Sequence, residues 1–241
     1  MFEIRLLIPF VSLLALAGCT QKENSQSVSA NEAGFVSLFD GKSLAGWRGY
    51  MEDPAMEVWS VQDGVIVSKS ASEKRDHANL MTVAEFDDFD LRWEWKIEEG
   101  ANSGVIFHVK EGPDKPYKTG PEYQILDNQG FRSGKGEPVS AQEYTAGHYA
   151  IEAPLQDATK PIGEWNSSRI LVVGNSVTYW LNGVKTAEYE MHSDKWNKQV
   201  AGAKFAKWPE YGMTGSGHIV LQDHGHAAAF RTIRIKDLSK S

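Results

Sequence analysis

The amino-acid sequence predicts an all-β fold, an antiparallel sandwich or barrel, on three observations. Short runs alternate apolar and polar residues, turn residues separate these runs, and helical periodicity is scarce. Alternation with a period of two is typical of strands buried on one face, and several such runs joined by turns indicate an antiparallel sheet. The predicted strands cover residues 90–98, 103–110, 121–126, 168–174, 176–183, 217–224 and 229–238.

The start of the chain, residues 1–18, predicts a secretory signal peptide. Arg5 provides a positive start, residues 6–16 form an almost unbroken apolar run, and Ala17 and Gly18 are small residues ahead of a cysteine. This order is the anatomy of an export signal. The apolar run is shorter than the roughly 20 residues that a membrane-spanning helix needs. The alternative is a buried N-terminal helix.

The next segment, residues 19–34, predicts a lipid-anchored tether. Cys19 is the only cysteine, so no disulfide can form within the chain. Its position after Leu-Ala-Gly resembles the bacterial lipobox, in which the thiol is acylated. The polar residues that follow favour a flexible segment. We therefore expect a lipoprotein of the cell envelope, on the periplasmic or surface side, that contacts the membrane only through its lipid.

The remainder, residues 35–241, predicts one domain. Neither a linker rich in Pro or Gly nor an internal repeat interrupts it, and a β-sandwich of this length is commonly a single domain. The formal net charge is −7. This acidic balance argues against nucleic-acid binding, which requires a basic face.

Two local signals lie outside the alternating pattern. Asn182-Gly183 follows an apolar run and predicts a tight hairpin, because both central positions of that turn need positive φ. Residues 193–205 are the best candidate for a helix.

The polar faces of four predicted strands carry residues suited to binding a sugar. Acid, base and amide groups predominate there, rather than interchangeable Lys, Ser and Thr. If the four strands share one sheet, its outer face would gather these groups into a site. The alternative is a solvated face with incidental ion pairs. The residues are Arg92, Glu94, His108, Glu122, Gln124, Gln222 and His224.

Specific segments then point to a family. They are LFDGKSLAGW from residue 38, GANSGVIFHV from 100, TGPEYQILDN from 119, PIGEWNSSRI from 161, YWLNGV from 179, GHIVLQDHG from 217 and FRTIRI from 230. In this order they resemble the 3-keto-disaccharide hydrolase family, whose members are 3-keto-glucoside 1,2-lyases and 3-keto-2-hydroxy-glucal hydratases. The resemblance runs from about residue 35 to residue 238.

The resemblance implies a fold, a substrate and a reaction. The fold would be a concanavalin-A-like jelly-roll β-sandwich of two antiparallel sheets. The substrate would be an oxidised (3-keto) glycoside or disaccharide. The C3 ketone acidifies the C2 proton, a base removes that proton, the enolate expels the C1 aglycone, and water adds to the double bond. A noncatalytic carbohydrate-binding lipoprotein on the same fold is the alternative, because a fold does not fix a function.

This chemistry suggests roles for the polar residues. Glu122 and His224 are the candidates for acid and base work. Structural alternatives are a Glu122–Arg92 pair and a turn at His224 before Gly225. His148 departs from the family, which has a small or apolar residue there, and receives no role. The candidates for substrate binding are Arg92, Glu94, His108, Gln124, Tyr149 and Gln222.

Cofactors are left open by the sequence. A divalent metal could stabilise an enediolate across O2 and O3. The histidines fit no recognised ligand spacing, and no cysteine ligand exists. Asp127 and Asp223 could instead bond to loop backbone. The ligands available to such a metal are His108, Glu122, Asp127, His218, His224 and His226.

The lipobox yields a direct prediction. Replacing Cys19→Ser removes the thiol that would be acylated, so metabolic labelling with a fatty acid should be lost and the protein should enter the soluble fraction. A variant that remains with the membrane would show that the lipobox interpretation is wrong.

Overall fold

The computed structural model describes residues 33–51, 53–69 and 78–239. The predicted signal peptide, Cys19 and most of the predicted tether lie outside these residues. The described residues form one compact unit. No helix among them is long and apolar enough to cross a membrane.

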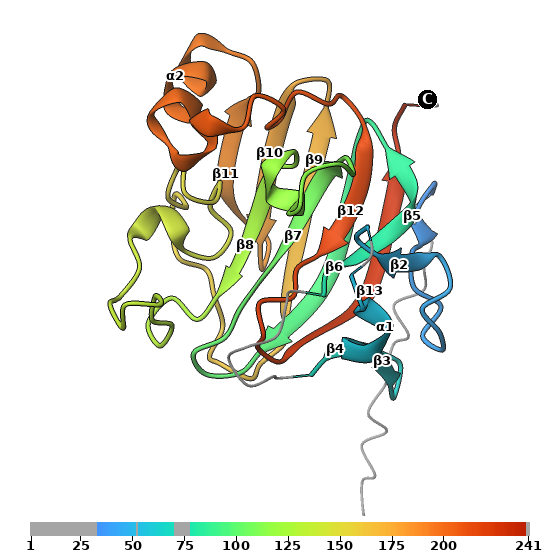
Figure 1. The fold of residues 1–241 in the computed structure, drawn as a ribbon. Coiled ribbons are helices and arrows are strands. Elements are labelled where there is room, and N and C mark those ends of the chain that lie inside the picture. Colours follow the sequence, from blue (N-terminus) through green and yellow to red (C-terminus); the bar gives the residue numbers. More distant parts are fainter. Residues whose placement is uncertain (1–32, 52, 70–77, 240–241) are drawn as a thin grey trace, which may run out of the picture. The chain divides into compact units, whose positions relative to one another are not determined.

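Two antiparallel sheets face each other, which confirms the predicted jelly-roll β-sandwich (Figure 1). The larger sheet follows the order β11 (Val184–Glu190), β10 (Ser176–Leu181), β9 (Asn166–Val173), β6 (Phe89–Ile97), β13 (Ala228–Asp237), β4 (Val65–Ser68) and β3 (Trp59–Gln62), with β1 (Val36–Ser37) also on β13. The smaller sheet follows the order β2 (Trp47–Gly49), β5 (Leu80–Phe86), β12 (Gly217–Leu221), β7 (Asn102–Val109) and β8 (Glu122–Leu126).

Within residues 33–51, 53–69 and 78–239, helical structure is confined to short segments. The predicted helix is confirmed as α2 (Asp194–Gly202), which Ser193 caps by accepting a hydrogen bond from the Trp196 N–H at 3.2 Å. The other segments are α1 (Ala55–Val58) and the 3₁₀ turns η1 (Pro116–Lys118), η2 (Ala141–Glu143) and η3 (Lys204–Lys207). The predicted hairpin is also confirmed, because Asn182 and Gly183 join β10 to β11 with φ of 51° and 81°.

Aromatic side chains from both sheets form the core between them. Trp93 of β6 meets Tyr123 of β8 edge-on at 5.0 Å, and Phe89 of β6 meets Phe107 of β7 at 5.9 Å. The Tyr123 hydroxyl also hydrogen-bonds Ser168 of β9 at 2.8 Å. Rings packed edge-on add about 0.5–1.5 kcal/mol per pair to the burial of their area. The predicted strand alternation therefore places its apolar side in the core.

The outer face of the smaller sheet carries a second apolar cluster, covered by the chain between β7 and β8. Its members are Tyr50, Met81, Ile106, Val109 and Val220, all at most 1% exposed. The Tyr50 hydroxyl donates to the Pro113 carbonyl at 2.6 Å, which ties residues 110–121 to this face. This covering segment brings η1 to the edge of the site described below.

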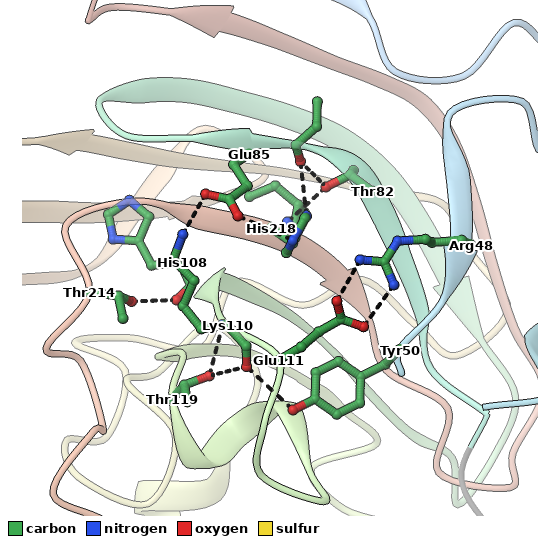
Figure 2. Close-up of polar contacts among 12 residues, drawn as sticks. Arg48, Tyr50, Thr82, Glu85, His108, Lys110, Glu111, Thr119, Thr214 and His218 are labelled. Carbon is green, nitrogen blue, oxygen red and sulfur yellow. Dashed lines mark hydrogen bonds and ion pairs between the residues drawn. The ribbon is translucent and has the colours of Figure 1, made fainter. Parts of the chain in front are cut away.

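A polar network secures one end of that segment (Figure 2). Arg48 of β2 donates two hydrogen bonds to the Glu111 carboxylate, at 2.7 and 2.8 Å. This contact holds the pKa of Glu111 well below its ordinary value. The Glu85 carboxylate lies between Lys110 and the His218 ring. Each half-exposed pair is worth about 0–1 kcal/mol, so the network orients the segment more than it stabilises the fold.

Candidate active site

Three neighbouring strands of the smaller sheet form the floor of a cleft on its outer face. Gly104 of β7 pairs with Gln124 of β8, and the Gln222 N–H donates to the Gly104 carbonyl at 2.9 Å. Glu122 precedes Gln124 by two residues on the same side of β8 and lies opposite Ile106. Tyr123 between them is fully buried in the core. Strand alternation therefore turns both polar side chains outward.

The cleft gathers most of the residues that the sequence singled out. Its empty space is about 580 Å³, open solvent at its mouth included. Of the predicted site residues, the structure brings together Glu122, Gln124, Gln222, His224 and Tyr149. The full lining is Asn79, Asn102, Lys115, Pro116, Tyr117, Glu122, Gln124, Tyr149, Lys204, Gln222, Asp223 and His224.

Gly104 leaves room for the Glu122 carboxyl group because it has no side chain. A Cβ atom at position 104 would overlap Glu122 Oε1 and lie 3.1 Å from its Cδ, and its three nearest atoms all belong to this side chain. The absence of a side chain lets the carboxyl group lie over the β7 backbone, beside Gln222. A glycine within a strand often marks such a close approach.

Glu122 is the most perturbed acid of the site. Its side chain is only 2% exposed. Burial raises the pKa of the Glu122 carboxyl to about 8, while the Lys204 ammonium and the Gln222 amide favour the charged form and oppose the rise. Burial disfavours a carboxylate because water no longer solvates its charge. The carboxyl group is therefore largely protonated at neutral pH.

The floor is rich in buried oxygen atoms that lack a hydrogen-bond donor of normal geometry within the described chain. They are both carboxyl oxygens of Glu122, Oε1 of Gln222 and Oδ1 of Asn102. Leaving a buried acceptor unsatisfied costs about 1–3 kcal/mol. This set favours a ligand that presents several hydroxyl groups.

The wall beside Glu122 consists of two tyrosines and a lysine. The Tyr149 N–H donates to the Glu122 carbonyl at 3.3 Å, so a backbone contact places Tyr149 next to the acid. The Lys204 Nζ lies 4.0 Å from the Tyr149 ring centroid and 5.5 Å from that of Tyr117. Sequence reasoning missed Lys204, Tyr117 and Asn102. The first two lie on irregular segments, and Asn102 lies just before the predicted strand 103–110.

The opposite side of the cleft carries His224 in a turn. Asp223 orders this turn by accepting the Ala78 N–H at 2.9 Å and the Gly225 N–H at 3.0 Å. The His224 and His226 rings are nearly parallel, with centroids 5.7 Å apart. The turn interpretation of His224 is thus correct, and the same turn presents its ring to the cleft.

Arg92 and Glu94 do not belong to this site, contrary to the prediction. Both lie on β6, which the topology assigns to the larger sheet, so their side of the strand faces away from the cleft. Arg92 pairs with Asp90 at 2.9 Å, and Glu94 accepts from Arg231 at 2.9 Å. They are ion pairs on a solvated face, and Arg92 is not the partner of Glu122.

His108 is also outside the cleft, and a local backbone feature explains the error. Its φ of 53° interrupts the strand alternation, so the ring turns inward beside Phe89 and Phe107. Its Nε2 lies 2.9 Å from the Asp87 carbonyl oxygen, and the side chain is 1% exposed. His108 is therefore a core residue.

The proposed metal ligands do not come together. No group of three His, Cys, Asp or Glu side chains with metal-site geometry occurs in residues 33–51, 53–69 and 78–239. Asp127 instead accepts loop N–H groups of Gly100 and Gly130, both at 2.8 Å, as the loop interpretation expected. His218 contacts Glu85 at the other end of the sheet.

His148, which received no role, is a packing residue. Its ring stacks on Tyr189 at 4.1 Å, and its Nε2 lies 3.1 Å from the Tyr211 hydroxyl. Burial lowers the pKa of His148 to about 3, so the ring is neutral. It supports the segment that carries Tyr149 from behind.

Comparisons with known proteins agree with this geometry. Residues 34–236 match the 3-keto-alpha-glucoside-1,2-lyase-like domain. A relative from Bacteroides thetaiotaomicron, named 3-keto-disaccharide hydrolase, is 31% identical over 89% of this chain and 82% of its own length. Two solved structures from Parabacteroides distasonis, described as candidate glycosyl hydrolases, each match 85% of this chain. One is 36% identical over 94% of its length with a TM-score of 0.77, and the other 29% over 99% with 0.65.

The close approach of Glu122 to Gly104 can be tested by a double-mutant cycle. Gly104→Ala should lower the free energy of unfolding by about 1–3 kcal/mol in the wild type, because the new methyl group displaces Glu122. In a Glu122→Ala background, where the obstructing side chain is gone, the same change should cost far less. Chemical denaturation of the four proteins measures both values. Gly215→Ala is the control, because nothing lies within 4 Å of a Cβ there. Equal losses of unfolding free energy in both backgrounds would show that Gly104 is not needed to make room for the Glu122 carboxyl group.

Proposed function

The chain belongs to the family of 3-keto-alpha-glucoside-1,2-lyase-like domains, and we propose that its cleft cleaves 3-keto glycosides by elimination followed by hydration. The family and the related 3-keto-disaccharide hydrolase establish the coarser statement, an enzyme that acts on keto sugars with carbohydrate hydrolase activity. The elimination route and the roles of individual residues are our proposal.

The proposed reaction has two stages. A base removes the C2 proton, which the C3 ketone acidifies, and the electron pair moves to O3 as an enolate. The ketone then reforms, C1 and C2 become doubly bonded, and the C1 oxygen leaves with a proton from an acid. Water next adds its oxygen to C1 and a proton to C2. The site must therefore supply a base, an acid and stabilisation of charge on O3.

The observation that carries the proposal is the acceptor-rich floor. Glu122, Gln222 and Asn102 present buried oxygen atoms to the cleft, and sugar hydroxyls are the donors that would satisfy them. The Tyr117 and Tyr149 rings on the wall offer apolar surface to the C–H groups of a sugar ring. Gln124 and Gln222 flank Glu122 and position the substrate.

The raised pKa of the Glu122 carboxyl group supports a role as the catalytic acid. A carboxyl group with a pKa near 8 is protonated at neutral pH and can give its proton to a leaving oxygen. We assign Glu122 this role. His224 on the other side of the cleft is then the base that removes the C2 proton, since histidine titrates near neutrality.

Both roles can be tested by substitution. Glu122→Gln and His224→Ala should each lower kcat/KM on a 3-keto disaccharide at least about 100-fold, the low end for losing acid or base catalysis. Sugar release is the readout. The wild type should act weakly or not at all on the unoxidised disaccharide, whose C2 proton is not acidified.

Matched controls separate catalysis from folding. Glu94→Gln changes an equivalent carboxylate on the opposite sheet and should retain full activity. Near-UV circular dichroism should show that both site variants remain folded. Folded, fully active site variants would exclude these roles. Substrate binding without any cleavage by the wild type would favour the noncatalytic carbohydrate-binding alternative.

The raised pKa of Glu122 predicts an alkaline limb in the pH profile. Because the acid must be protonated, kcat/KM should fall as pH rises through about 8, by about tenfold for each further unit. Measuring kcat/KM across neutral and alkaline pH tests for this decrease. A profile that keeps rising through this range would contradict an acid role, and Glu122→Gln should lack the limb in its residual activity.

A further inference from the structure

The cleft lining includes two lysines, Lys115 and Lys204, and neither takes part in the proposed acid and base roles. Lys204 is the one held beside Tyr149 on the wall next to Glu122. It begins η3, two residues after the end of α2, lines the cleft and is exposed to solvent. Its ammonium group makes no hydrogen bond or ion pair with any residue of the described chain, and instead lies over Tyr149 at 4.0 Å. Its N–H donors are therefore available to a ligand.

We propose that Lys204 stabilises the negative charge that develops on O3 of the keto sugar when the C2 proton is removed. The inference rests on the proposed function and deepens it. It identifies the electrophilic residue that an enolate requires and that the sequence did not reveal.

Three aromatic rings hold the ammonium group in position. Besides Tyr149, the rings of Tyr117 and Phe205 lie 5.5 and 5.3 Å from Nζ. Cation–π contacts of this kind are attractive and become stronger when the cation is desolvated. They fix a flexible side chain without neutralising its charge, as a carboxylate partner would. The charge therefore remains available to a developing anion.

Electrostatics link Lys204 to the acid across the same cleft. Lys204 favours the charged form of Glu122, and partial desolvation lowers the pKa of the Lys204 ammonium while Glu122 opposes that shift. With Glu122 protonated, Asp223 is the remaining carboxylate in the cleft lining, and its oxygens accept the Ala78 and Gly225 N–H groups. A bound substrate that expels water strengthens the attraction between this cation and an enolate oxygen.

The step is balanced within the substrate and the side chains. The base takes the C2 proton, the C–H electron pair forms the C2–C3 double bond, and the carbonyl pair moves onto O3. Lys204 donates a hydrogen bond to O3 without giving up its proton. When the ketone reforms, either the C1 oxygen leaves or, without a leaving group, a solvent proton returns to C2.

Proton exchange at C2 isolates this step. The probe is a 3-keto glucose derivative that has two hydrogens at C1 and therefore no leaving group there. Each enolisation in D₂O replaces the C2 proton by deuterium, which NMR detects. Lys204→Met should slow the exchange at least about 100-fold, the low end for removing one oxyanion donor. Lys204→Gln should do the same, whereas Lys204→Arg should restore part of the rate because it keeps the charge.

Controls distinguish the role of Lys204 from general effects on the protein. Lys207→Met lies on the same 3₁₀ turn, with its Nζ over Trp208 at 4.7 Å and outside the cleft lining, and should exchange like the wild type. Full exchange by a folded Lys204→Met would overturn this inference alone. No exchange by the wild type would overturn the proposed function and this inference with it.

Discussion

The insertion of Tyr123 between the two sheets is the constraint on which the site depends. Its ring is fully buried against Trp93, and its hydroxyl hydrogen-bonds Ser168 at 2.8 Å on the facing sheet. A one-residue slip of β8 would place Glu122 in the core and Tyr123 in water. The core therefore fixes the register of β8, and this register presents Glu122 and Gln124 to the cleft. The residue that stabilises the sandwich also orients the chemistry.

The buried carboxyl group is tolerated because its surroundings give it a defined protonation state. Gly104 leaves room for it on the sheet, and the lack of solvation favours its neutral form. The loops provide what the sheet does not: a tyrosine pair, a lysine and a histidine, carried on segments outside the strands. The rigid sheet thus holds the acid, while the loops bring the groups that face it. Such a division is typical of sites built from a scaffold and its connections.

The sequence could predict the side of each strand but not its sheet. The alternation of the predicted strand 121–126 places Glu122 and Gln124 on one side, and this is correct. Gln222 and His224 lie beyond the end of β12 at Leu221, although both line the cleft. Arg92 and Glu94 also alternate regularly with apolar residues, yet β6 pairs with β9 and β13 in the other sheet. Strand pairing depends on residues far apart in the sequence, so the alternation within one strand does not predict it. His108 failed for a different reason, because one residue with positive φ reverses the pattern. Lys204 lies on a 3₁₀ turn, where no periodicity indicates a direction.

The central claim is that the bond at C1 breaks by elimination and not by direct displacement by water. Cleavage of a 3-keto disaccharide in D₂O, with the C2 position of the released keto sugar analysed by NMR at early times, tests it most directly. Hydration of the double bond delivers a solvent proton to C2, so elimination followed by hydration should place deuterium at that carbon. The free keto sugar in enzyme-free D₂O gives the background exchange. Release of a sugar that retains its original C2 proton would contradict the account.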